Sequence, residues 1–270
     1  MATRDRLDNL LTEKGLAESR EKAKRMILSG AVLVNDLVMD KPGALVAADS
    51  IIRVKRQEEF VSRGGLKLRE ALERFHVSCR GLTAVDVGAS TGGFTHCLLE
   101  HGTKKVYAVD VGYGQMDWRL RQDPRVTLLE RKNARHLTLE DLGDVRPDLA
   151  VVDVSFISLK LVTPPVRALL LPGEGRLIAL IKPQFEAGKG KVGKGGIIKT
   201  PEVLREVLIE LLGWFQKEGW EFGGLVSSPI LGQKGNREFL IYLLNRSSPS
   251  SWDFDFDRFV LGVMDPVSGS

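Results

Sequence analysis

The sequence predicts an α/β protein in which helices cover both faces of a largely parallel sheet, preceded by a smaller α+β unit. Three observations support this fold class. From residue 66 onward, short apolar runs alternate with helical stretches, as in sheets built from strand–helix–strand units. A glycine-rich turn at residues 86–95 (DVGASTGGFT) joins one apolar run to a helix-like stretch. Residues 3–54 instead carry two helical patterns and several short strand patterns.

The N-terminal unit is predicted from helical spacing and turn signals. Ser19 is placed to cap the second of two helices and Gly30 to close it. Residues 32–34 and 37–38, on either side of Asn35 and Asp36, predict a hairpin, and residues 51–54 predict a further strand. Each helix has apolar residues at i, i+3 and i+4: Leu7, Leu10 and Leu11 in the first, and Ala23, Met26 and Ile27 in the second.

The second unit is predicted to begin with a helix at residues 66–75. The clearest later helix spans residues 201–217, and ligands in such sheets bind beyond the carboxyl ends of the strands. We expect strands at residues 83–87, 105–109, 126–129, 149–152, 177–181, 225–226 and 239–243.

Charged residues 55–59 mark the boundary between the two units. We therefore expect one domain over residues 1–58, a second over 59–246, and a C-terminal tail over 247–270. The tail begins with a Ser/Pro-rich stretch and continues with aromatic and acidic residues without a clear period. A docked tail and a disordered tail are both compatible with that pattern.

Composition excludes several protein classes. The chain has 270 residues, of which 43% are hydrophobic and 27% are charged, as in globular proteins. No run of about 18 apolar residues and no secretory signal are found, and Cys79 and Cys97 have no metal-ligand spacing. We expect a cytoplasmic protein with no membrane segment and no metal site. The net charge of +4 and the pI of about 9.0 permit a nucleic acid partner without requiring one.

The turn at residues 86–95 is compared with three nucleotide-binding motifs. A P-loop needs lysine directly after its last glycine, where this chain has Phe94. A dinucleotide-binding turn needs a middle glycine, where this chain has Ser90. S-adenosylmethionine has no phosphate, and needs a tight turn beside its amino-acid moiety and a carboxylate for its ribose hydroxyls. Asp110 closes the next strand pattern 24 residues after Asp86, which suits that role.

A second glycine-rich stretch at residues 188–195 (GKGKVGKG) matches the P-loop up to its last position. Gly195 stands where Ser or Thr would hold magnesium, and no helix pattern begins there. We interpret the stretch as a mobile basic loop over an RNA backbone, with a plain solvated loop as the alternative.

Five sequence blocks, in this order, resemble the TlyA (hemolysin A) family of ribosomal RNA ribose 2′-O-methyltransferases. Its members join an S4 RNA-binding domain to a methyltransferase domain related to FtsJ. The resemblance extends to about residue 245 and implies a small α+β S4 domain followed by a Rossmann-like domain that depends on S-adenosylmethionine. The blocks are 61–68 (VSRGGLKL), 86–95 (DVGASTGGFT), 152–159 (VDVSFISL), 181–186 (IKPQFE) and 235–239 (GNREF).

The N-terminal unit resembles an S4 domain in residues 6–8 (RLD), 19–20 (SR), 29–35 (SGAVLVN) and 49–51 (DSI). A basic cluster on a helix is usually a solvated surface, but this resemblance favours RNA binding. The expected RNA contacts are Arg4, Arg6, Arg20, Lys22, Lys24, Arg25, Arg63, Lys189, Lys191 and Lys194.

The resemblance also implies the residues of the active site. A Lys-Asp-Lys-Glu catalytic set falls on Lys67, Asp153, Lys182 and Glu238. For Asp153, capping of the following helix is the alternative role. The expected S-adenosylmethionine contacts are Asp86, Gly88, Ala89, Ser90, Gly92 and Gly93 in the turn, Asp110 at the ribose, and Asn133 and Ala134 near the adenine. For Asp86, bracing of the turn is the alternative to direct binding.

Methyl transfer from a sulfonium needs alignment of the nucleophile and removal of its proton, but no metal or covalent intermediate. Our hypothesis is that Lys182 is the general base, with Lys67 as the like-charged neighbour that lowers the pKa of a lysine. Asp153 and Glu238 would hold the two ammonium groups in place. The alternative keeps Lys182 charged, as a stabiliser of the developing alkoxide.

The resemblance therefore implies methylation of a ribose 2′-hydroxyl, in cytidine for relatives, with ribosomal RNA or ribosomal subunits as partners. A base-methylating enzyme of the same fold is one alternative. A non-catalytic protein of ribosome assembly and a membrane-lysing toxin are others. The sequence leaves the target nucleotide and the oligomeric state open.

Overall fold

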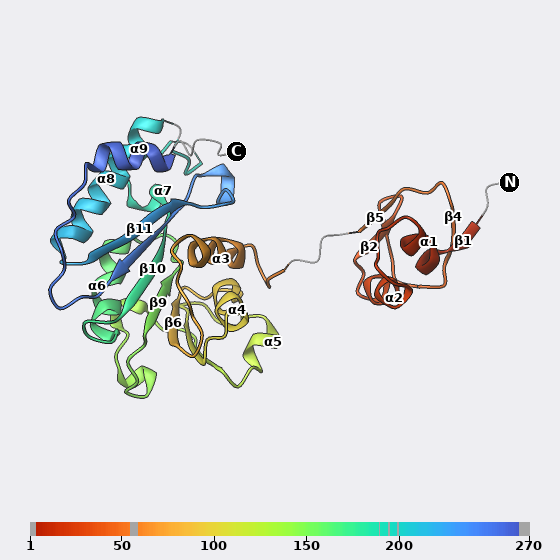
Figure 1. Cartoon of the computed structure of the whole chain (residues 1–270), viewed down its shortest axis with the longest axis horizontal. Coiled ribbons are helices and arrows are strands. Elements are labelled where there is room, and N and C mark those ends of the chain that lie inside the picture. The colour runs from red at the N-terminus through yellow and green to blue at the C-terminus, as the bar shows by residue number, and fades with distance from the viewer. Residues whose placement is uncertain (1–3, 55–58, 189, 194, 199, 265–270) are drawn as a thin grey trace. The chain divides into compact units, whose positions relative to one another are not determined.

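The computed structural model describes residues 4–54, 59–188, 190–193, 195–198 and 200–264. The chain divides into two compact units, Met1–Glu58 and Glu59–Ser270 (Figure 1). Each unit has its own apolar core, so each is described separately.

The N-terminal unit packs two helices, α1 (Leu7–Glu13) and α2 (Arg20–Leu28), against short strands. Ser19 caps α2 by accepting a hydrogen bond from the Lys22 N–H, which confirms the predicted helix start. The predicted hairpin is also confirmed, because Asn35 and Asp36 adopt positive φ between its two strands. The strands form a sheet of β3 (Leu37–Met39), β2 (Val32–Val34) and β5 (Ile52–Val54), and a pair of β1 (Arg4–Arg6) and β4 (Leu45–Ala47).

The second unit is built on a seven-stranded sheet of order β11-β12-β10-β9-β6-β7-β8. Five neighbouring strands run parallel, and β12 is antiparallel to both β10 and β11. The predicted α/β class with a largely parallel sheet is therefore confirmed. The strands are β6 (Thr83–Val87), β7 (Lys105–Val109), β8 (Val126–Leu129), β9 (Leu149–Val152), β10 (Arg176–Ile181), β11 (Glu221–Ser227) and β12 (Phe239–Leu244).

Helices cover both faces of this sheet (Figure 1). One apolar cluster joins the sheet to α6 (Leu159–Leu169), α8 (Pro201–Lys217) and α9 (Phe256–Met264). The other joins the opposite face to α3 (Gly64–Arg74), α4 (Gly93–Glu100) and α5 (Trp118–Arg121). A short helix, α7 (Pro183–Glu186), directly follows β10.

The segment after residue 246 is part of the second unit's core. Trp252, Val260 and Met264 are buried, and the Trp252 indole N–H donates to the Trp220 carbonyl oxygen at 2.8 Å. Of the two options left by the sequence, a docked segment is found as far as residue 264. Among the residues described, no helix combines the length and the apolar character needed to cross a membrane.

Candidate active site

The glycine-rich turn between β6 and α4 brings the ends of two neighbouring strands close together. Gly88 has φ +86°, and a Cβ there would lie 2.5 Å from the Asp153 carbonyl oxygen. Gly92, at φ +95°, directly precedes α4. Only glycine suits both positions, because side chains would collide and L-residues rarely adopt this φ. The two glycines therefore allow a tight turn that packs on the end of β9 and on α5.

Asp110, at the end of β7, stabilises this turn. Its Oδ2 accepts a hydrogen bond from the Ser90 N–H at 2.7 Å, and its Oδ1 accepts one from the Gly112 N–H at 2.6 Å. Asn133 lies beyond the next strand end and caps a short 3₁₀ turn that begins with the buried Ala134. The expected adenosine contacts thus lie on adjacent strand ends, outside the lining of the cavity described below.

Asp86 is fully buried in β6, directly before the turn. Its Oδ2 accepts from the Thr95 hydroxyl at 2.6 Å, whereas its Oδ1 has no hydrogen-bond partner. Desolvation raises the pKa of Asp86 to about 7, opposed by the Thr95 hydrogen bond and reinforced by the negative charge of Asp153. Asp86 therefore braces the start of α4 rather than lining the cavity.

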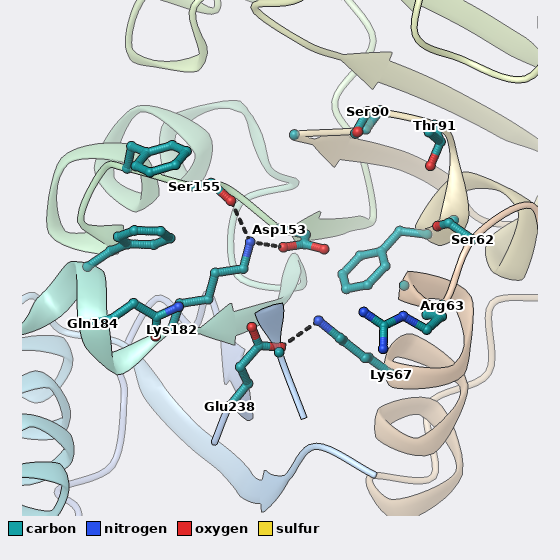
Figure 2. Close-up of a pocket in the computed structure, with 18 residues that line it drawn as sticks. Ser62, Arg63, Lys67, Ser90, Thr91, Asp153, Ser155, Lys182, Gln184 and Glu238 are labelled. Atoms are coloured by element: carbon teal, nitrogen blue, oxygen red, sulfur yellow. Dashed lines mark hydrogen bonds and ion pairs between the residues drawn. The ribbon is translucent and has the colours of Figure 1, made fainter. Parts of the chain in front are cut away.

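A cavity of about 350 Å³ opens beside the turn and contains all four residues of the expected catalytic set. Figure 2 shows the side chains of Lys67, Asp153, Lys182 and Glu238 directed toward one common space. Gly88, Ala89, Ser90 and Gly93 also line it, together with Arg63. The cavity therefore joins the turn to a set of two amines and two acids.

The four charges form two separate ion pairs. Lys67 Nζ lies 2.5 Å from Glu238 Oε2, and both side chains are buried. Lys182 Nζ lies 2.6 Å from Asp153 Oδ1 and donates to Ser155 Oγ at 2.8 Å (Figure 2). Each ammonium group is thus held by an acid, and both point into the cavity.

The topology of the sheet explains why these residues meet. Asp153 and Lys182 follow the parallel neighbours β9 and β10, whose carboxyl ends share one edge of the sheet. Glu238 precedes β12, which is antiparallel to β10, with Phe239 paired with Ile181. The start of an antiparallel strand therefore lies at the same edge. Lys67 comes from α3, which packs on α4.

The alternative role of Asp153 as a helix cap is not what the structure shows. Ser158 caps α6 by accepting from the Lys160 N–H at 3.1 Å. Asp153 lies five residues before that cap and pairs with Lys182 instead.

Sequence reasoning gave no role to an aromatic pair on the cavity wall. Phe156 is 89% exposed and has φ +64°, and its ring centroid lies 4.9 Å from that of Phe185. Ser155 and Gln184 line the cavity beside these rings. All four residues fall in the sequence blocks 152–159 and 181–186. Their place in these blocks was therefore the sequence feature that could have pointed to a role in the cavity. An exposed aromatic wall in a polar cavity suits a flat ligand such as a nucleobase.

The expected RNA contacts of the N-terminal unit lie on β1 and α2, and most of their side chains are exposed. Arg6 and Arg20 both donate to Asp8, at 3.0 and 3.1 Å, while their own side chains stay about half exposed. Asp8 is fully buried, and the hydrogen bond from Arg6, joined by that from Arg20, lowers its pKa to about 2. Lys22 pairs with Glu18 and Lys24 with Glu21, whereas Arg4 and Arg25 are exposed.

The remaining expected RNA contacts belong to the second unit. Arg63 is exposed at the start of α3 and lines the cavity. Lys191 pairs with Glu206 on α8 at 3.0 Å. Lys189 and Lys194 lie outside the described residues. Within the described part of the chain, no group of three or more His, Cys, Asp or Glu side chains is arranged to hold a metal ion.

The sheet order, the glycine turn and the cavity at the strand ends define a methyltransferase unit of the α/β class. Comparison with family models matches residues 60–244 to the FtsJ-like methyltransferases and residues 5–52 to the S4 domain. The chain belongs to the FtsJ-like methyltransferase family, and its N-terminal unit is an S4 domain.

Similar proteins cover most of the chain. A relative from Bacillus subtilis (strain 168), provisionally named rRNA methyltransferase YqxC, is 50% identical over 89% of this chain and 85% of its own length. The 16S/23S rRNA (cytidine-2′-O)-methyltransferase TlyA of Mycobacterium tuberculosis (strain ATCC 25618 / H37Rv) is 43% identical over 90% of this chain and 91% of its own. A solved structure from Streptococcus thermophilus, provisionally described as a hemolysin, is 39% identical, with a TM-score of 0.73 over 98% of this chain and 97% of its own.

Proposed function

We propose that this protein transfers the methyl group of S-adenosylmethionine to a ribose 2′-hydroxyl of a cytidine in ribosomal RNA. The observation that carries the proposal is the meeting of two Lys–acid ion pairs in one cavity beside the glycine turn. The names of the relatives from M. tuberculosis and B. subtilis supply the reaction and the RNA class.

The residues around the turn fit S-adenosylmethionine. Gly88 and Gly92 let the turn pack closely on Asp153 and on Leu120, where a Cβ would collide, and Gly88 and Ser90 line the cavity. Asp110 keeps free lone pairs that can accept from ribose hydroxyls. Gly93 and Ala89 complete the contacts in the turn, and Asn133 with Ala134 would lie beside the adenine. Once bound, S-adenosylmethionine supplies an already activated methyl group, so the protein has only to align the nucleophile and manage its proton.

Lys182 takes the role of general base in its neutral amine form, in which Nζ has a lone pair to accept the proton of the 2′-hydroxyl. Its Nζ reaches into the cavity, with Asp153 and Ser155 fixing its position. Lys67, held by Glu238, places a second positive charge where it stabilises the alkoxide that forms as the proton leaves. A positioned base contributes roughly 10²–10⁴-fold to the rate of such a step.

The S4 domain and the rim of the cavity bind the RNA. Arg4, Arg6, Arg20 and the other basic residues of α2 present guanidinium and ammonium groups to phosphates. In the second unit, Arg63 adds a positive charge to the lining of the cavity. The aromatic pair of Phe156 and Phe185 offers a stacking surface for the target base. Ribosomal RNA or a ribosomal subunit is thus the partner, and the cytoplasm is the place of action.

The proposal is tested with purified protein, ribosomal subunits and radiolabelled S-adenosylmethionine, followed by mass mapping of the RNA. We expect one or a few new 2′-O-methylcytidines with the wild type and none with Lys182→Ala, whose binding of S-adenosylmethionine stays intact. A methyl group on a base, or no methylation of either subunit, would refute the proposed reaction.

A further inference from the structure

One carboxylate that the mechanism does not use connects two segments of the active site. Glu186 ends α7, four residues after Lys182. Its Oε2 accepts from the Ser158 hydroxyl at 2.6 Å, and its Oε1 accepts from the Leu159 N–H at 2.8 Å. Both donors belong to the segment after β9, which also carries Asp153. Glu186 therefore joins the segment after β10 to the segment after β9.

Contact with the N-terminus of α6 accounts for only one of the two hydrogen bonds of Glu186, the one from the Leu159 N–H, and not for the one from the Ser158 hydroxyl. The helix already has its cap in Ser158, which accepts from the Lys160 N–H. A negative charge at a helix N-terminus is favourable, but an acid of the helix's own first turn would serve that purpose. Glu186 comes from another element, and desolvation raises its pKa while its two hydrogen bonds favour the charged form. The specific consequence of the contact is a fixed distance between the two segments.

Two further contacts join the same segments on the cavity side. Lys182 donates to Ser155, and the ring of Phe156 packs on that of Phe185. Phe156 has φ +64°, a conformation that is unfavourable for a non-glycine residue and persists only where its surroundings hold it. Ser158 lies two residues after Phe156. The hydrogen bond from the Ser158 hydroxyl to Glu186 therefore restrains the backbone next to this strained residue.

We infer that Glu186 is a positioning residue for methyl transfer, which holds the loop of Asp153, Ser155 and Phe156 in register with Lys182. This inference rests on the proposed function of the cavity. Without the carboxylate, the loop loses its anchor, and Asp153 and Ser155 no longer fix the Lys182 amine. A substitution outside the reacting groups that displaces them by about 1 Å can lower the rate by about 10²-fold.

Two substitutions of Glu186 separate positioning from general support of the fold. Glu186→Ala removes both acceptors, and we expect kcat to fall about 10- to 100-fold, with KM for S-adenosylmethionine within about twofold of wild type. Glu186→Gln keeps an acceptor for the Leu159 N–H, and its amide can donate to the Ser158 hydroxyl, so kcat stays within about threefold. Glu210→Gln is the matched control, because Glu210 pairs with Lys160 outside the cavity.

Hydrogen exchange measured on the same proteins tests the anchor without any reaction. In Glu186→Ala, we expect amides of residues 154–160 to exchange at least about tenfold faster, while those of β6 and β7 stay at the wild-type rate. Wild-type kcat in Glu186→Ala, an equal loss in Glu186→Gln, or unchanged exchange at residues 154–160 would each overturn the inference. If the wild type methylates no ribose, the proposed function fails, and the exchange data still decide whether Glu186 anchors the loop.

Discussion

The two units of this protein treat their charges in opposite ways. In the methyltransferase unit, Lys67 and Glu238 are enclosed together, and Asp86 is buried with only a hydroxyl as partner. In the S4 domain, the buried Asp8 holds two arginines whose guanidinium groups remain about half exposed. The first arrangement keeps charges away from water, and the second presents them to it.

Partners, more than burial, set the electrostatics of the two aspartates. Asp86 and Asp8 are both fully buried, yet the pKa of Asp86 is raised to about 7 and that of Asp8 is lowered to about 2. Asp86 loses hydration without gaining a cation, whereas Asp8 gains two. Enclosed charges therefore suit chemistry on a bound nucleotide, and exposed arginines fixed by one acid suit the binding of phosphates.

The largest effect on the rate is expected from substitution of Lys182, the lysine that we propose as the base. Arginine keeps the positive charge but does not release its proton in proteins, so Lys182→Arg should lose about 10²–10⁴-fold in kcat. Lys160→Arg, outside the cavity, is the control and should keep wild-type kcat. Single-turnover methylation measures both. If Lys182→Arg retains most of its rate, Lys182 acts as a charged stabiliser of the alkoxide and not as a base.

The next effect concerns Asp86 and depends on pH. Its carboxyl ionises near 3.8 in the unfolded chain and near 7 in the folded one, so folding favours the protonated form. The stability that it contributes is full below about pH 4 and is lost as pH rises through about 7. Asp86→Asn should therefore raise the melting temperature relative to wild type more at pH 8 than at pH 5. Equal differences at the two pH values would show that the carboxyl is not protonated on folding.

Asp8 should behave in the opposite sense. Its stabilising contribution is present above about pH 4 and is lost as pH falls through about 2, because its folded pKa is depressed. We expect Asp8→Asn to cost about 1.5–3 kcal/mol in the free energy of unfolding at pH 7. Urea denaturation measures this value. A loss that is equally large at pH 2 would contradict the ion-pair explanation.

The smallest effect is expected from one exposed arginine. Arg20→Ala should weaken RNA binding and lower the slope of log affinity against log salt by about one. Arg53→Ala is a matched control, because Arg53 is an exposed arginine of the same domain that pairs with Asp36 and is not among the expected RNA contacts. Filter binding over a range of salt concentrations checks both. An unchanged salt slope in Arg20→Ala would remove this residue from the RNA interface.

The sequence predicted most of the sheet because its central strands are fully buried. A strand buried on both faces is a nearly continuous apolar run, so β6, β7 and β9 were predicted with the bounds that the structure has, as was the half-buried edge strand β8. The pair of β1 and β4 was missed. These strands have three residues each, and their pairing depends on contacts that no local pattern encodes. Helix α9 was missed although its apolar residues recur at i, i+3, i+4, i+7 and i+8, because the tail was read as a single segment with the aromatic and acidic residues that precede the helix.

The sequence predicted which charged residues form the candidate site, but not which of them contact one another. The resemblance placed four charged residues in one site, whereas the pairing of Lys67 with Glu238 depends on β12 running antiparallel. Phe156 received no role, because its residue type favours neither its exposure nor its positive φ. Asp110 was predicted to contact ribose, and its hydrogen bonds to the turn could be seen only in the structure.

The contrast between the two units is tested most directly by single-turnover methylation of a ribosomal subunit by Lys182→Ala and Arg20→Ala across a range of RNA concentrations. For Lys182→Ala, we expect wild-type RNA affinity and a lost rate at saturation. For Arg20→Ala, we expect weaker affinity and a wild-type rate at saturation. A lost saturating rate in Arg20→Ala together with a retained one in Lys182→Ala would contradict the contrast between the two units.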